Sequence, residues 1–113
     1  FPGAPGLLRD CVGPGWALVG DAGYFKDPAT AHGITDALVD ADRLGRAFSA
    51  GDPGAYQRTR DHLAGEIMSI THRIASFDCA LAEVKTLHAR LNTCLKAELA
   101  SLDLPLRPDQ LAA

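Results

Sequence analysis

The sequence predicts a mainly α-helical chain, in which a short strand or hairpin precedes one amphipathic helix and then an antiparallel pair of helices. Two observations support this fold class. Of 11 Gly and 7 Pro, all but Gly65, Pro105 and Pro108 lie within the first 54 residues, so turns are concentrated there. From residue 34 onward apolar residues recur at helical spacing, and no Gly or Pro interrupts residues 66–104.

The strand is predicted from the apolar run Trp16-Ala17-Leu18-Val19. This run lies between the turn Gly13-Pro14-Gly15 and the pair Gly20-Asp21. A short run that is apolar on both faces and bounded by turn residues is typical of a buried strand. Because a lone strand or short hairpin leaves unpaired edges, we expect it to belong to a larger sheet.

The first helix is predicted after an irregular stretch, residues 22–30. Its apolar residues recur at helical spacing and are Ile34, Ala37, Leu38, Ala41, Leu44 and Phe48. The charged residues on its other faces are Asp36, Asp40, Arg43 and Arg46. The pattern predicts an amphipathic helix of about four turns that ends just before Gly51.

Two further helices are predicted in the second half. Asp52 and Pro53 are expected as N-cap and first helical residue. The apolar stripe of the second helix consists of Leu63, Ile67, Ile70, Ile74 and Phe77. A break is expected at 76–78, where Ser and Asp can cap a new helix. The stripe of the third helix consists of Leu81, Val84, Leu87, Leu91, Leu95, Leu99 and Leu102. Residues 104–113 are predicted to form a flexible tail.

Composition excludes several classes of protein. The 113 residues carry a net charge of −3, which excludes a strongly basic nucleic-acid-binding protein. No apolar run is long enough for a transmembrane segment. Neither the three cysteines nor the histidines have metal-site spacing, so no metal is expected and a reducing, cytoplasmic location is favoured. Because the chain has no initiator Met and no signal peptide, we expect it to lack an N-terminal part.

The candidate site combines a carboxylate after the strand with the start of the first helix. Asp21 can accept hydrogen bonds from sugar hydroxyls, and Gly20 and Gly23 are expected to let a ligand approach the backbone. The N–H groups of Gly33 and Ile34 point out of the positive end of the helix, which favours an acceptor oxygen or a negative charge. A single ligand with a polyol chain and an electron-rich carbonyl edge would satisfy both features.

These residues resemble a motif of a known family. The motif has three parts: the sequence Leu-Val-Gly-Asp-Ala that ends at Ala22, Pro28 seven residues after Asp21, and Gly33 at the start of a helix with a downstream Asp-Ala. Together they resemble the second FAD-binding motif of flavin-dependent aromatic hydroxylases, halogenases and geranylgeranyl-reductase-type oxidoreductases. The resemblance covers about residues 13–48.

The resemblance implies roles for individual residues. Asp21 would bind the ribityl hydroxyls of FAD, and Gly20 and Ala22 would shape the turn. Pro28 would lie beside the isoalloxazine ring, and the N–H groups of Gly33 and Ile34 would meet its N1 and C2-carbonyl edge. No general base, nucleophile or metal cluster is present to run catalysis, so the sequence assigns no catalytic residue.

The implied fold is a mainly α fragment of an α/β, Rossmann-like FAD-binding flavoprotein. Residues 1–51 would belong to the FAD-binding domain and residues 52–103 to a C-terminal helical region. The implied function is that of an FAD-dependent, monooxygenase-like oxidoreductase that uses NAD(P)H-reduced flavin on a small organic substrate. The chain has no Gly-x-Gly-x-x-Gly for the ADP half of FAD, so alone it is expected to bind FAD weakly and to be inactive.

The chain departs from the family motif at two positions, and two of its features allow more than one interpretation. Many members of the family have His where this chain has Tyr24, and Gly where it has Ala31. The pair Lys26-Asp27 is either an exposed ion pair or part of a loop that guards the ring. The alternative function is a standalone helical interaction module without a cofactor, whose leucine stripes pack against a partner or a second copy.

Overall fold

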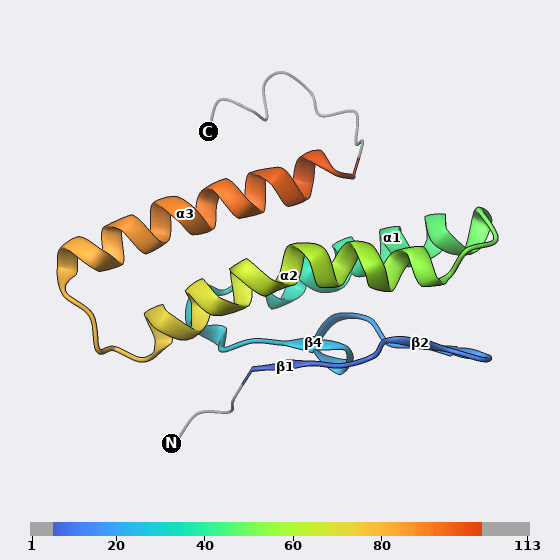
Figure 1. The fold of residues 1–113 in the computed structure, drawn as a ribbon, viewed down its shortest axis with the longest axis horizontal. Coiled ribbons are helices and arrows are strands. Elements are labelled where there is room, and N and C mark those ends of the chain that lie inside the picture. The colour runs from blue at the N-terminus through green and yellow to red at the C-terminus, as the bar shows by residue number, and fades with distance from the viewer. Residues whose placement is uncertain (1–5, 103–113) are drawn as a thin grey trace.

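The computed structural model describes residues 6–102. Within them the chain is mainly helical (Figure 1). It has three α-helices and two pairs of short antiparallel strands. This confirms the mainly α class. The elements, with 3-10 helices labelled η, are β1 (Leu7–Leu8), β2 (Val12–Gly13), β3 (Trp16–Ala17), η1 (Gly20–Ala22), β4 (Tyr24–Phe25), η2 (Pro28–Thr30), α1 (Gly33–Ser49), α2 (Gly54–Ala75) and α3 (Leu81–Ala100).

The predicted strand forms a small hairpin. β3 pairs with β2, in the register Val12 to Ala17 and Gly13 to Trp16. Between them Pro14 is followed by Gly15 at φ 78°, the left-handed conformation that a tight turn with Pro before Gly requires. Trp16 is 48% exposed. The expectation of a buried strand is therefore wrong, because β3 pairs only with β2 over two residues and no second layer covers this side chain.

The remaining two strands join the start of the described chain to the segment after η1. β1 pairs with β4 in the register Leu7 to Phe25 and Leu8 to Tyr24. Each sheet of the described residues has two strands, so the larger sheet expected around the hairpin is not formed by residues 6–102.

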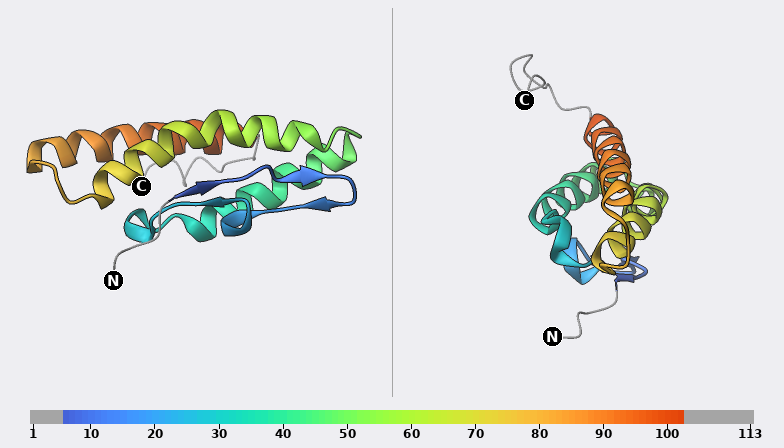
Figure 2. Two further views of the ribbon diagram at one scale, coloured as in Figure 1. Left: turned by 60° about the horizontal axis from the view of Figure 1, so that its bottom comes forward. Right: turned by 90° about the vertical axis from the view of Figure 1, so that its left-hand side faces the viewer.

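Two apolar clusters form the core. The first joins α2 to α3, which run antiparallel as predicted (Figure 1), and consists of Ile67, Ile70, Leu87 and Leu91. The second joins α1, α2 and the β2–β3 hairpin through Cys11, Ala47 and Tyr56. In the end-on view of Figure 2, α1 and α2 lie on opposite sides, with α3 above and the strands below.

Helix α1 buries charge and exposes apolar side chains. Asp36, Asp40 and Arg43 are at most 7% exposed, and Arg43 pairs with Glu98 of α3 at 3.2 Å. Ile34, Leu38 and Phe48 are 81%, 68% and 59% exposed. An amphipathic helix normally buries its apolar face. We name the exposed residues Ile34, Leu38, Ala41, Gly45 and Phe48 the outer stripe of α1.

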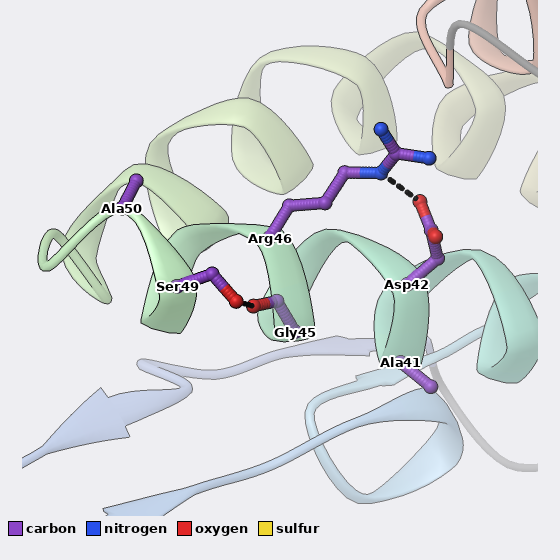
Figure 3. Close-up of a pocket in the computed structure, with 6 residues that line it drawn as sticks. All are labelled: Ala41, Asp42, Gly45, Arg46, Ser49 and Ala50. Carbon is purple, nitrogen blue, oxygen red and sulfur yellow. Dashed lines mark hydrogen bonds and ion pairs between the residues drawn. The ribbon is translucent and has the colours of Figure 1, made fainter.

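A shallow, open groove on α1 shares Ala41 and Gly45 with the outer stripe. It is lined by Ala41, Asp42, Gly45, Arg46, Ser49 and Ala50 (Figure 3). Across it Arg46 Nε donates to Asp42 Oδ2 at 2.7 Å, and Ser49 Oγ donates to the Gly45 carbonyl at 2.9 Å. None of the predicted site residues lines this groove.

The helix ends differ from prediction only in their caps. Gly51 follows α1 at φ 74°, as predicted. Pro53, not Asp52, is the N-cap of α2, and the Asp52 carboxylate pairs with Arg58 instead. The break between α2 and α3 falls where predicted, with Phe77 at φ 53°.

The capping expected at this break is not formed. Ala80 is the N-cap of α3 and no side chain caps it. The predicted tail, 104–113, lies outside the described residues. No helix in the described part of the chain is both long and apolar enough to span a membrane.

Candidate functional site

The turn η1 presents Asp21 to solvent. Val19 is extended, with φ −127° and ψ 156°, and Gly20 then takes φ 56°, which reverses the chain into the 3-10 helix. The turn is closed by the Gly23 N–H, which donates to the Gly20 carbonyl at 2.9 Å. The Asp21 side chain is exposed as a result and is able to accept hydrogen bonds from a ligand.

Gly20 is anchored to α1. Its N–H donates to Asp40 Oδ2 at 2.9 Å in a buried contact. A Cβ at this position would lie 2.9 Å from Ala37 Cβ, closer than real Cβ contacts. Glycine is therefore required here by packing against α1 and by its positive φ. This differs from the expectation that Gly20 opens the backbone to a ligand.

Gly23 is likewise closed by its neighbours. A Cβ there would lie 2.8 Å from Arg60 Nη1 and 3.2 Å from the Leu18 carbonyl oxygen. Arg60 is 2% exposed and also donates to the Arg9 carbonyl. The Arg60 side chain therefore occupies the space beside Gly23 in which a ligand was expected.

The start of α1 is shaped by η2 and the two residues after it. Asp27 Oδ1 caps η2 by accepting from the Ala29 N–H at 2.9 Å. Ala31 has φ 56° and ψ 28°, a left-handed conformation that is rare for residues other than glycine. His32 is the N-cap of α1, and the Asp36 N–H donates to its carbonyl at 2.9 Å. The amides of Gly33, Ile34 and Thr35 precede the first intrahelical bond, so they are available to a ligand.

The structure brings Asp21 next to the start of α1. A Cβ built on Gly33 would lie 3.6 Å from Asp21 Oδ1, so the carboxylate lies directly beside the first residue of the helix. Ala22, Pro28 and Ile34 are exposed as well. Five of the six predicted site residues are therefore accessible on an open surface, and Gly20 lies beneath them.

Sequence reasoning missed a buried ion pair behind this surface. Lys26 Nζ pairs with Asp36 Oδ2, and the two side chains are 4% and 5% exposed. Lys26 is therefore buried and paired with Asp36, and it is not the exposed ion-pair partner of Asp27. The sequence contained one signal for this buried face: Asp36, Asp40, Arg43 and Ala47 are spaced 4, 3 and 4 residues apart, so they lie on one face of the helix, as the apolar residues do.

Burial also sets the protonation of the groups behind the site. It raises the pKa of the Asp40 carboxyl above its ordinary value, against the opposing effects of the Gly20 N–H and the Tyr56 hydroxyl. The same cause, aided by the charge of Asp40, raises the pKa of Tyr56, whose hydroxyl donates to the Leu18 carbonyl at 2.9 Å. The Tyr56 hydroxyl therefore stays protonated at neutral pH and can donate.

Comparison with known proteins gives no match. No protein-family model matches the chain, and neither the curated proteins nor the solved structures gave a similar one. The interpretation of the site therefore depends on its own geometry and on the resemblance of its motif.

Replacing Ala31 by glycine is expected to raise the free energy of unfolding by about 0.5–1 kcal/mol. Release from the left-handed conformation is worth about 1–2 kcal/mol, and the greater entropy of unfolded glycine costs about 0.5–1 kcal/mol. Thermal or urea denaturation measures the change. Ala29→Gly is the control, since Ala29 is exposed and has no positive φ, and it is expected to destabilise slightly. Equal destabilisation by both variants would contradict the prediction.

Proposed function

We propose that this chain is part of an FAD-dependent oxidoreductase and supplies the half of the site that holds the ribityl chain and the isoalloxazine ring. The observation that carries the proposal is the position of Asp21 Oδ1, 3.6 Å from a Cβ built on Gly33 at the start of α1. An acceptor for hydroxyl groups and donors for a carbonyl edge thus lie side by side.

The residues present fit this cofactor. Asp21 would accept hydrogen bonds from ribityl hydroxyls, and the N–H groups of Gly33 and Ile34 would donate to the N1 and C2-carbonyl edge of the ring. The positive end of α1 favours negative charge at that edge. When bound, FAD supplies the two-electron chemistry of the oxidoreductase.

Two further features support the resemblance on which the proposal rests. Ala31 is left-handed at the position where many members of the family have glycine, the residue that adopts this conformation at least cost. Asp40, part of an Asp-Ala pair downstream of Gly33, holds the Gly20 N–H. Ala31 therefore adopts the conformation that glycine adopts most readily.

The reaction follows from the resemblance. We propose monooxygenase-like chemistry, with NAD(P)H as the reductant and a small organic molecule as the substrate. In this chain Asp21 and the first amides of α1 bind and orient the cofactor, and we assign them no proton transfer. The dinucleotide-binding fold for the ADP half would lie in the preceding part of the same protein.

A second candidate is an interaction module without a cofactor. The outer stripe of α1 favours it, because Ile34, Leu38 and Phe48 are more than half exposed. An exposed apolar face on a helix is a common docking surface for another protein. The same exposure is also expected of a chain that packs against the rest of a larger protein.

Flavin binding separates the two candidates. The protein is produced together with the sequence that precedes Phe1 in its gene, and its visible absorption is recorded before and after FAD is added. The flavoprotein hypothesis predicts the absorption bands of bound flavin in the purified protein. A folded protein that remains colourless after incubation with FAD would support the interaction module.

Replacing Asp21 by alanine is expected to weaken FAD binding about 5- to 150-fold, which corresponds to about 1–3 kcal/mol for the loss of a charged hydrogen-bond acceptor. Titration of the apoprotein with FAD, followed by fluorescence, measures the affinity. Asp52→Ala is the matched control, because this exposed carboxylate lies beyond the opposite end of α1 and pairs with Arg58. Equal affinity in the two variants would contradict the role of Asp21.

A further inference from the structure

A buried ion pair lies behind the start of α1. Lys26 follows β4, Asp36 is in the first turn of α1, and their side chains are 4% and 5% exposed. Lys26 Nζ also lies 4.5 Å from the centroid of the Tyr24 ring. The pair therefore tethers β4 to the helix in a region that solvent and salt screen little.

Each charge of this pair acts on the start of α1. Asp36 is three residues after Gly33, which is about 4.5 Å along a helix axis. An acidic residue in the first turn offsets the positive potential of the helix N-terminus. Lys26 neutralises that carboxylate, so Asp36 does not lower the positive potential at the amides of Gly33 and Ile34.

We propose that Lys26 and Asp36 set the reduction potential of the flavin, by fixing the charge behind the amides that meet the N1 and C2-carbonyl edge. This inference rests on the proposed function. Two-electron reduction with uptake of one proton leaves one negative charge on the ring, at the edge that faces α1. A positive charge behind this edge favours the reduced form, and a negative charge favours the oxidised form.

The two single substitutions have opposite expected effects. Asp36→Asn leaves the positive charge of Lys26, so it raises the affinity for reduced relative to oxidised flavin, by about tenfold. Lys26→Gln leaves the negative charge of Asp36 and lowers this ratio by about the same factor. For a two-electron couple a tenfold change corresponds to ~30 mV. A purely structural role would weaken binding in both variants without opposite shifts.

The test is a reductive titration of the FAD-loaded protein, produced with its preceding sequence, using dithionite as the electron donor and a dye of known potential. Asp42→Asn is the control, because this residue of α1 pairs with Arg46 in a half-exposed contact farther from the helix start. It is expected to leave the potential unchanged. The double variant Lys26→Gln/Asp36→Asn is expected to return close to the wild-type value.

Each outcome decides one question. A rise for Asp36→Asn together with a fall for Lys26→Gln supports the proposal. If one variant does not bind FAD, the expected shift in the other variant supports it. Shifts of the same sign, the absence of a shift, or loss of FAD binding in both variants overturns it and leaves the pair a structural role. A wild-type protein that binds no FAD overturns the proposed function itself.

Discussion

Replacing Gly20 by alanine is expected to lower the free energy of unfolding of the chain by about 1.5–4 kcal/mol. The left-handed conformation at φ 56° costs about 1–2 kcal/mol for a residue with a Cβ, and the lower entropy of unfolded alanine offsets about 0.5–1 kcal/mol of this. The new Cβ would also lie 2.9 Å from Ala37 Cβ, and overpacking of this kind costs about 1–3 kcal/mol. Urea denaturation measures the loss. Because the turn carries Asp21, the FAD affinity of the full-length protein is expected to fall as well.

Gly15 provides the control for Gly20→Ala. It has φ 78°, but no atom lies within 4 Å of the Cβ that alanine would add. Gly15→Ala therefore has the conformational cost alone, about 0.5–1 kcal/mol after the entropy difference between unfolded glycine and alanine is subtracted. If the two variants lose equal stability, the close approach of η1 to α1 has no energetic consequence and this part of the argument fails.

The second large effect is expected at Asp40, where alanine should cost about 3 kcal/mol. Asp40 is 2% exposed, and its carboxylate accepts the Gly20 N–H at 2.9 Å. Alanine removes a charged acceptor and leaves this buried N–H without its partner. Denaturant titration measures the effect. Asp42→Ala, two residues away and half-buried, is expected to stay within about 1 kcal/mol of wild type, as surface ion pairs do. Similar losses at both positions would contradict the role of Asp40.

Asp40 also predicts the sign of a pH dependence. Burial raises the pKa of its carboxyl in the folded chain above the ordinary value of 3.8. At pH values between 3.8 and the raised pKa, the folded state binds more protons than the unfolded state, so this group's contribution to stability decreases as the pH rises. The stability of the wild type relative to Asp40→Asn is therefore expected to increase as the pH falls from 7 towards 4. An unchanged or opposite difference would contradict this account.

The helices and their ends were largely predictable from the sequence. Gly51 and the break at 76–78 interrupt apolar patterns that are otherwise continuous, and such local signals do not depend on the rest of the fold. The strands were less predictable, because two-residue strands are too short to show an alternating pattern. Trp16 is exposed because no second layer covers β3, and a run of apolar residues in the sequence does not reveal this.

The orientation of α1 was not predictable in the same way. Helical spacing gives the period of a stripe, but two stripes of α1 follow that period. One is apolar and contains Ile34, Leu38 and Ala41; the other is charged and contains Asp36, Asp40 and Arg43. Which face is buried depends on partners far away in the sequence, such as Glu98 for Arg43. The exposed half of the candidate site, Asp21 with Gly33, was predictable because its residues lie close together in the sequence. Its buried support was not.

The outer stripe of α1 has a practical consequence for the isolated chain. A net charge of −3 gives weak repulsion between molecules, whereas Ile34, Leu38 and Phe48 present an apolar band on one side of one helix. Self-association of the isolated chain through this band is therefore expected to be opposed only weakly by its total charge.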